Sequence, residues 1–253
     1  NLYAFFIGKI YPIKQTGYYT QAQRQNDTIK FTFLSIFNSV SYNLFAQTQR
    51  DVVQQKELFG KIMQKANLLT IPLFIVLAIM CPSLFGLLLG EKWLPAVPYF
   101  QLLCMSQLFS ISDLLCYNLL NARGHTRLTL HVESLKKTAM LLSLLLLPIG
   151  IHYTLWAYIG ICWICTLAWL VLVHKEIGLG TKLIWKNFVP AIAVGSIAGC
   201  VIWNIDLIIP QMSSGWMATK IIVGFTLYVL LIVRTYPRLF QELKTVFSAL
   251  KDE

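Results

Sequence analysis

A polar stripe runs along a segment of this chain that is long enough to cross a membrane. No residue between Lys30 and Arg50 carries a formal charge, and a transmembrane helix needs about 20 residues. At about 100° per residue, apolar residues such as Phe33 and Phe37 share one helix face. Hydroxyl and amide groups gather on the other face, and they include Ser35, Asn38, Ser39, Tyr42 and Gln49.

This stripe has two interpretations. Unsatisfied polar groups cost several kcal/mol each in hydrocarbon, so the stripe must meet other helices or water. In the first interpretation, the side chains form hydrogen bonds between packed helices. In the second, they line a hydrated cavity for a polar substrate.

Asp113 is the one acidic residue that falls inside a predicted apolar span, in the stretch LFSISDLLCYN. Carboxylates in such positions usually face a bundle interior or a water path. Asp113 therefore predicts either a structural hydrogen bond to a nearby hydroxyl or a site that couples transport to a proton or cation. If it couples transport, the Asp113→Asn variant should lose coupled transport.

Other reactive residue types form no recognisable site. The Cys162–Cys165 pair lies in an apolar helix without nearby charge, and all six cysteines are expected to be small core residues. The four histidines lie at span ends or in loops. No phosphate-binding G-x-x-x-x-G-K-[ST] motif is present. We therefore predict no catalytic residue, no metal site and no cofactor, and we do not expect an enzyme.

The composition explains why most residues lack chemical roles. Of the 253 residues, 57% are hydrophobic and 13% are charged, whereas globular proteins are nearer 25% charged. We predict an all-α integral membrane protein with a bundle of about seven transmembrane helices. The chain opens at Asn1 within an apolar run, and we expect a fragment that begins in or just after an earlier helix. The predicted spans are 31–48, 67–90, 94–119, 134–150, 153–173, 187–205 and 216–233.

The basic residues predict an orientation. Most of the 21 Lys and Arg residues fall in alternate connections and in the tail 234–253, which marks that side as cytoplasmic. This bias accounts for the net charge of +10, so no nucleic-acid partner is expected. Residues 1–30 are predicted to hold the end of a preceding helix and an outer loop. Their basic residues break the alternation, so either 31–48 does not cross or the cations line an outward-facing cavity: Lys9, Lys14, Arg24 and Lys30.

Four stretches in order resemble bacterial polysaccharide flippases. IGKIYP…GYYTQAQR is similar to an "lG-x-Y-x-x-A" pattern. FNSVSYNLFAQTQRD is similar to a "P-x-l-s-x-x-q-x-d" pattern, although Phe45 or Ala46 stands where proline is frequent. LLLGEKWLPAVPYFQLL resembles "G-x-k-W-x-x-A" through Gly90 and Trp93, and NLLNARGHTRL resembles "l-x-A-x-G-r-t" through Gly124. Residues 130–253 add only hydropathy.

The family implied is the oligosaccharide flippase branch, for lipopolysaccharide or teichuronic acid export, of the multidrug/oligosaccharidyl-lipid/polysaccharide exporters. The resemblance implies two helical bundles, of which this chain is most of the second, in a multi-pass protein of the bacterial cytoplasmic (inner) membrane. It implies that a lipid-linked oligosaccharide, a polyprenyl-pyrophosphate glycan, crosses through a central cavity by alternating access. Membrane lipids and polysaccharide polymerase machinery are the other partners to expect.

The residue chemistry fits that substrate class. Arg24 and Lys30 are the candidates for binding phosphate, and arginine offers a two-pronged donor that suits it. Asn38, Tyr42 and Asn43 are the candidates for binding sugar, and Asp113 for ion coupling. Two other functions stay open: a drug/cation antiporter of the same superfold, and a membrane-bound glycan polymerase, ligase or acyltransferase. The antiporter would favour acidic cavity residues, and the enzymes would favour a large outer loop or clustered His and Arg.

Overall fold

The described part of the chain is built of helices. The computed structural model describes residues 2–208, 219, 222–226 and 228–230, and no strand occurs among them. The helices are α1 (Leu2–Ile10), α2 (Ile13–Gln47), α3 (Val52–Leu88), α4 (Val97–Gln107), α5 (Ser110–Ala122), α6 (Thr126–Ser143), α7 (Ile151–Ile177) and α8 (Thr181–Ile208). Short 3₁₀ helices, Glu91–Ala96 and Leu144–Leu146, precede α4 and follow α6.

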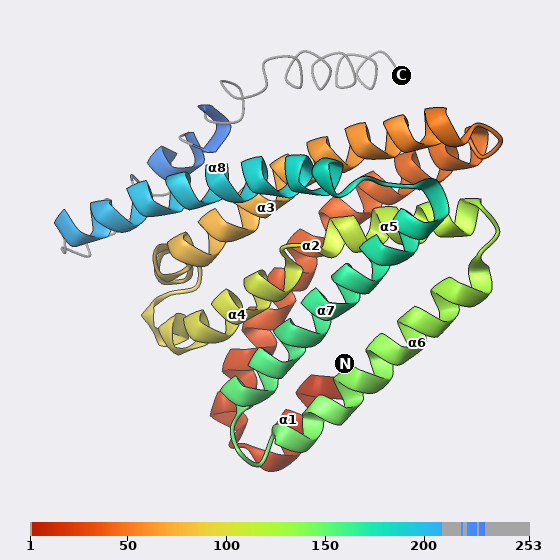
Figure 1. Cartoon of the computed structure of the whole chain (residues 1–253). Helices are drawn as coiled ribbons and strands as arrows, with labels where there is room; N and C mark the ends of the chain where they lie inside the picture. The colour runs from red at the N-terminus through yellow and green to blue at the C-terminus, as the bar shows by residue number, and fades with distance from the viewer. Residues whose placement is uncertain (1, 209–218, 220–221, 227, 231–253) are drawn as a thin grey trace, which may run out of the picture.

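Two apolar clusters hold the helices together. One joins α1, α2, α3, α4 and α7 through large side chains that include Tyr19, Phe74, Phe100 and Leu155. The other joins α2, α3, α5 and α7 through Phe45, Phe59, Leu115 and Trp169. In Figure 1, α6 and α7 lie side by side and run in opposite directions, and α8 runs along α3. The helix α6 packs on α7 and lies at the edge of the bundle.

Four helical stretches among the described residues are long and apolar enough to cross a membrane: Val52–Leu88, Glu91–Ala122, Ile151–Ile177 and Trp185–Asn204. With the all-α architecture, they make this a membrane protein. The predicted spans 31–48 and 134–150 lie largely on α2 and α6, which are not among these four. Half of the predicted span 216–233 and the whole tail 234–253 lie outside the described residues.

Residues 1–30 differ from the prediction of an outer loop. The chain forms α1 and then, after a break at Pro12, enters α2, which continues without interruption for 35 residues. Proline lacks a backbone N–H and is tolerated at a helix start, where that donor would be unpaired. Lys14, Arg24 and Lys30 therefore lie on α2, and the helix phase decides which direction each one faces.

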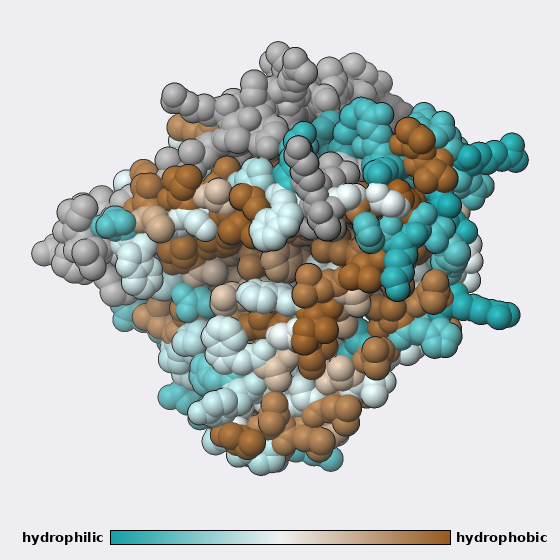
Figure 2. All heavy atoms as spheres, in the orientation of Figure 1, coloured by the Kyte–Doolittle hydropathy of each residue, from teal (hydrophilic) through white to brown (hydrophobic). Residues whose placement is uncertain are grey.

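The connections α2–α3, α5–α6 and α7–α8 lie at the same end of the molecule (Figure 1). The carboxylate of Asp51 caps α3 by accepting hydrogen bonds from the backbone N–H groups of Val53 and Gln54, at 2.9 and 3.0 Å. Gly124 ends α5 with a φ of 84°, which glycine adopts without steric cost. Hydrophilic residues cover this end of the surface, at the upper right of Figure 2.

Two lysines near the start of the predicted span 134–150 lie well inside a helix. Lys136 and Lys137 are in the middle of α6, because that helix begins at Thr126 rather than near residue 134. They are therefore not part of the connection α5–α6. Their side chains belong to the cavity described below.

Small residues let α8 approach α3. A Cβ atom placed on Gly195 would lie 2.6 Å from Cδ1 of Ile75 and 3.0 Å from Cα of Pro72, and a Cβ atom on Gly199 would overlap Ile79. Close approach of backbones at small residues is a common way for membrane helices to pack. The small-residue spacing of this segment therefore serves helix packing.

Candidate functional site

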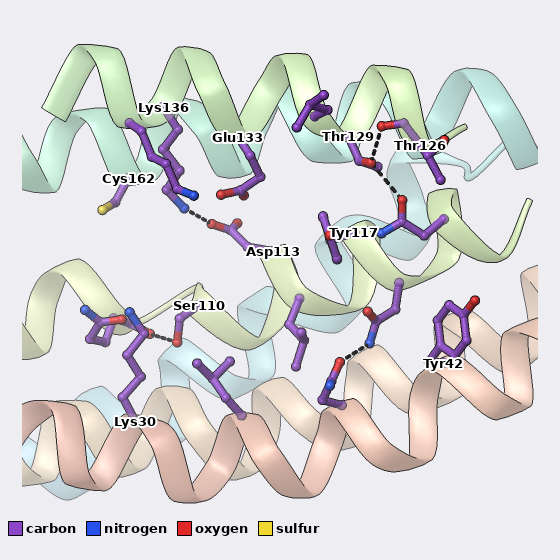
Figure 3. A pocket seen from close by; sticks show the side chains of 18 of the residues that line it. Lys30, Tyr42, Ser110, Asp113, Tyr117, Thr126, Thr129, Glu133, Lys136 and Cys162 are labelled. Atoms are coloured by element: carbon purple, nitrogen blue, oxygen red, sulfur yellow. Dashed lines mark hydrogen bonds and ion pairs between the residues drawn. The ribbon is translucent and has the colours of Figure 1, made fainter. Parts of the chain in front are cut away.

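A polar cavity of about 1190 Å³ lies between α2, α5 and α6, with contributions from α4 and α7. Its wall combines hydroxyls, amides and charged groups, which include Lys30, Asn38, Ser39, Tyr42, Asn43, Ser110, Asp113, Asn118, Asn121, Arg127, Thr129, Glu133, Lys136 and Lys137. Figure 3 shows α6 and α2 on opposite sides of the space, with α5 between them. The cavity thus brings polar and charged groups together with apolar side chains inside the bundle.

The α2 wall follows from helical spacing. Lys30, Leu34, Asn38 and Tyr42 recur every fourth residue and all line the cavity, because residues four apart lie above one another on a helix. Asn43 lines it as well, and its amide donates to the carbonyl of Ser39 on the same helix, at 3.1 Å. Ser35 faces elsewhere: it is exposed, and its hydroxyl donates to the carbonyl of Thr32.

Both interpretations of the polar stripe apply, to different residues. The buried amide of Asn118 on α5 donates to Asn38 Oδ1 at 2.9 Å and to Ser41 Oγ at 2.8 Å. This amide therefore hydrogen-bonds α5 to α2, as packed membrane helices often do. Asn38, Tyr42 and Asn43 are nevertheless exposed on the cavity side, so they can also contact a bound molecule.

Asp113 is held by two partners that the sequence did not indicate. Its Oδ2 accepts a hydrogen bond from Lys136 Nζ on α6 at 2.8 Å, and its Oδ1 accepts one from Thr166 Oγ1 on α7 at 2.6 Å. The side chain of Asp113 is 12% exposed and that of Lys136 is 16% exposed. The carboxylate thus links α5, α6 and α7 at the cavity wall, and Figure 3 shows it pointing toward Lys136.

The cavity carries more positive than negative charge. Four basic side chains line it, Lys30, Arg127, Lys136 and Lys137, against the two carboxylates of Asp113 and Glu133. Lys30 rises from α2 and Lys136 descends from α6 toward the same end of the space (Figure 3). Within the part of the chain that the structure describes, Lys136 is the one of these four with an ion-pair partner.

The spacing of residues in the sequence indicates which side of α6 lines the cavity. Thr126, Thr129, Glu133, Lys136 and Met140 recur at intervals of three or four residues and line the cavity, which is the pattern of one helix face. The opposite face is apolar and exposed, for example at Leu135 (70%) and Leu142 (61%). The sequence alone did not identify α6 as an amphipathic helix, because the predicted span 134–150 begins about two turns after the helix does.

Arg24 does not line the cavity. It borders shallow grooves on another side of α2, where its neighbours include Thr20 and Trp93. Arg24 and Lys30 are six residues apart, which corresponds to about 240° of helical rotation. The two candidates for binding phosphate therefore face different sides of α2, and Lys30 is the one of the two that lines the cavity.

A second polar cluster joins the helices at the end of the molecule where the connections α2–α3, α5–α6 and α7–α8 lie. Glu176 Oε1 on α7 accepts from Arg123 Nε at 2.7 Å and lies 2.9 Å from His125 Nε2. Arg123 also donates to Gln55 Oε1 on α3 at 2.8 Å, and Gln55 Nε2 donates to the carbonyl of Phe45 at 3.0 Å. This cluster ties together the ends of α2, α3, α5 and α7.

The described part of the chain offers no set of side chains that could hold a metal ion. No group of three or more His, Cys, Asp or Glu side chains converges there. Cys162 lines the cavity and is buried as a free thiol, whereas Cys200 is exposed and does not behave as the core residue that was predicted.

The comparison with protein families gives one match. Residues 1–98 match a family of polysaccharide biosynthesis proteins. The matched range includes α2, with Lys30, Asn38, Tyr42 and Asn43, and ends within α4. No curated protein and no solved structure is similar enough to count as a match.

The match supports a role in polysaccharide biosynthesis or export. It covers the helix that forms one wall of the cavity, and three of the four stretches on which the flippase resemblance rests. The residues that complete the cavity, among them Asp113 and Lys136, lie beyond the matched range.

Proposed function

We propose that this protein moves a lipid-linked oligosaccharide, a polyprenyl-pyrophosphate glycan, from the inner to the outer leaflet of the bacterial cytoplasmic membrane for polysaccharide biosynthesis. The observation that carries the proposal is the cavity of about 1190 Å³, polar and net basic, inside an apolar helical bundle. A pyrophosphate and its sugars are too polar to cross hydrocarbon alone, and this cavity offers them partners.

Each part of the wall suits a part of that substrate. Lys30 and the lysines of α6 provide positive charge for the pyrophosphate. Asn38, Tyr42 and Asn43 provide amides and a hydroxyl, which donate to and accept from sugar hydroxyls. Because the cavity is already bordered by α2, α5 and α6, the substrate needs no large rearrangement to find these groups.

The transport step is alternating access, in which helices rearrange about a site near the middle of the membrane so that it opens to one side at a time. In this proposal the chain works with a second helical bundle, and Asp113 couples the cycle to an ion gradient. Membrane lipids surround the bundle, and the polysaccharide polymerase machinery receives the flipped glycan.

The two alternatives have less support from the site. A drug/cation antiporter would favour an acidic cavity, whereas four basic side chains line this one against two carboxylates. A glycan polymerase or acyltransferase would place a nucleophile or a His and Arg cluster in its cavity. The described histidines are absent from this wall, and its Cys162 is buried.

Transport in vesicles tests the proposal. The full-length protein is reconstituted with a fluorescent lipid-linked oligosaccharide, and the fraction of label that reaches the opposite leaflet is measured over time. We expect transport by the wild type and at least a tenfold slower rate for Lys30→Gln, because the variant loses one charged contact worth about 1.5–3 kcal/mol.

The matched control is Arg24→Gln, which removes the same charge from the same helix outside the cavity. It should transport at the wild-type rate. Absence of transport by the wild type would refute the flippase proposal, and equal loss in both variants would refute the role of the cavity.

A further inference from the structure

We propose that Lys136 is an anion-binding group of this cavity and that Asp113 is its built-in competitor, so that an anion gains the ammonium group of Lys136 only by displacing Asp113. The inference rests on the proposed substrate class and adds to it a carboxylate that occupies a substrate-binding lysine until a pyrophosphate group takes its place. It starts from the contact between Lys136 Nζ and Asp113 Oδ2 at 2.8 Å.

The ion pair occupies a place where a substrate can reach it. Both side chains line the cavity, and each keeps a small exposed fraction, 12% for Asp113 and 16% for Lys136. An ammonium group has three donors, and one of them is committed to Asp113. An anion in the cavity can therefore approach Lys136 without first separating the helices.

Asp113 can release Lys136 without being left unpaired. Its other oxygen accepts from the Thr166 hydroxyl on α7 at 2.6 Å, and this bond does not depend on α6. A buried carboxylate that loses all its partners would cost several kcal/mol. The Thr166 hydroxyl and water in the cavity keep that cost low, so Lys136 can exchange Asp113 for a bound anion.

The charges of the two lysines indicate which anion can compete with Asp113 for Lys136. Lys30 and Lys136 approach the same end of the cavity from opposite walls (Figure 3). A singly charged anion is satisfied by Lys30 and does not compete with Asp113. A pyrophosphate diester carries one negative charge on each phosphorus, so its second charge has an ammonium to gain only if Asp113 yields Lys136.

Calorimetric titration of the full-length protein in lipid nanodiscs with inorganic pyrophosphate tests the inference. Asp113→Asn should bind pyrophosphate about tenfold more tightly than the wild type, because Lys136 no longer has a charged competitor. Lys136→Gln should bind about tenfold more weakly. Inorganic phosphate should gain less in Asp113→Asn than pyrophosphate does, because it carries less charge and makes the weaker contact with Lys136.

A second acidic residue of the wall provides the matched control. Glu133→Gln removes the same charge from the cavity, but Glu133 has no contact with Lys136 within salt-bridge distance in the described structure. It should raise the affinity for pyrophosphate less than Asp113→Asn does. In the double variant Asp113→Asn/Lys136→Gln, the gain from the first change should vanish, because the competitor acts only through Lys136.

Three results would overturn the inference: no gain in Asp113→Asn, an equal gain in Glu133→Gln, or a full gain in the double variant. Lack of pyrophosphate binding by both wild type and Asp113→Asn would overturn it too, even if glycan transport in vesicles is intact. Conversely, the expected pattern without glycan transport would leave the anion site standing and refute the flippase proposal. Thermal unfolding of each variant verifies that it is folded.

Discussion

Asn118 shows how a single buried amide can be structural while its neighbours remain free for a ligand. It donates to Asn38 and Ser41 at 2.9 and 2.8 Å and is 2% exposed. Asn118→Leu would leave both acceptors without this donor, and we expect a loss of about 1–3 kcal/mol in the free energy of unfolding. Unfolding by denaturant in mixed micelles measures it.

The control for this prediction is Asn43→Leu. The amide of Asn43 bonds to a carbonyl of its own helix and lies on the cavity side, so this change should alter the unfolding free energy little while it slows glycan transport. A stable Asn118→Leu protein would show that the contact between α2 and α5 does not depend on this amide.

The contribution of the Arg123–Glu176 ion pair to the free energy of unfolding depends on how far its side chains are buried. Its side chains are 17% and 24% exposed, whereas those of the Lys61–Glu57 pair are 64% and 65% exposed. Double-mutant cycles on unfolding free energy should give a coupling of about 1–2 kcal/mol for the first pair and at most about 0.5 kcal/mol for the second. Equal coupling energies in the two cycles would contradict the argument.

Several cavity residues were readable from the sequence and others were not. Asn38 and Tyr42 follow from the polar stripe of a charge-free segment, which is local information. Arg24 was misplaced because the prediction treated the basic residues as a loop and ignored the helix phase that separates it from Lys30. The ion pair of Asp113 with Lys136 is a contact between two helices, and no pattern within either helix specifies it.

At the scale of elements, hydropathy identifies helices with uniform apolar surroundings and fails for helices with two different faces. α3 and α7 lie among the predicted spans because most of their length is apolar. α6 has charged residues toward the cavity and leucines on its exposed face, so an average over the helix hides both. Its start was therefore predicted about two turns too late.

The packing of α8 on α3 gives a prediction for a whole element. Gly195→Ala should destabilise the protein by about 1–3 kcal/mol, because its Cβ would approach Ile75 and the backbone of Pro72 too closely. Gly160→Ala is the matched control, since nothing lies within 4 Å of a Cβ at that position on α7. It should be neutral or slightly stabilising, because alanine favours helix over glycine.

Denaturant unfolding of both alanine variants measures the difference. If Gly195→Ala is as stable as Gly160→Ala, the close approach of α8 to α3 does not need glycine. Retention of α8 against α3 can be followed independently by protease protection of the segment after α7.

At the scale of the whole molecule, the surface of the cavity and the outer surface must meet different solvents. Apolar side chains are exposed on the outside, for example Ile36 at 55% on α2 and Ile164 at 67% on α7. Figure 2 shows hydrophobic residues in brown over much of the face that it presents. The cavity wall on the same α2 is polar. One helix therefore presents apolar residues on its outer side and polar residues to the cavity, and we expect the first to meet hydrocarbon and the second water.

Cysteine labelling of the protein in membranes tests this arrangement. In a variant whose six native cysteines are replaced, Asn43→Cys should react with a charged, water-soluble maleimide, because the thiolate that reacts forms only where water reaches it. Ile36→Cys, exposed on the same helix but away from the cavity, should react at least tenfold more slowly, because hydrocarbon disfavours the thiolate. An excess of pyrophosphate should slow labelling at Asn43→Cys and leave Ile36→Cys unchanged. Equal rates at the two positions would mean that α2 does not separate water from lipid, and the cavity could not then carry a polar substrate through the membrane.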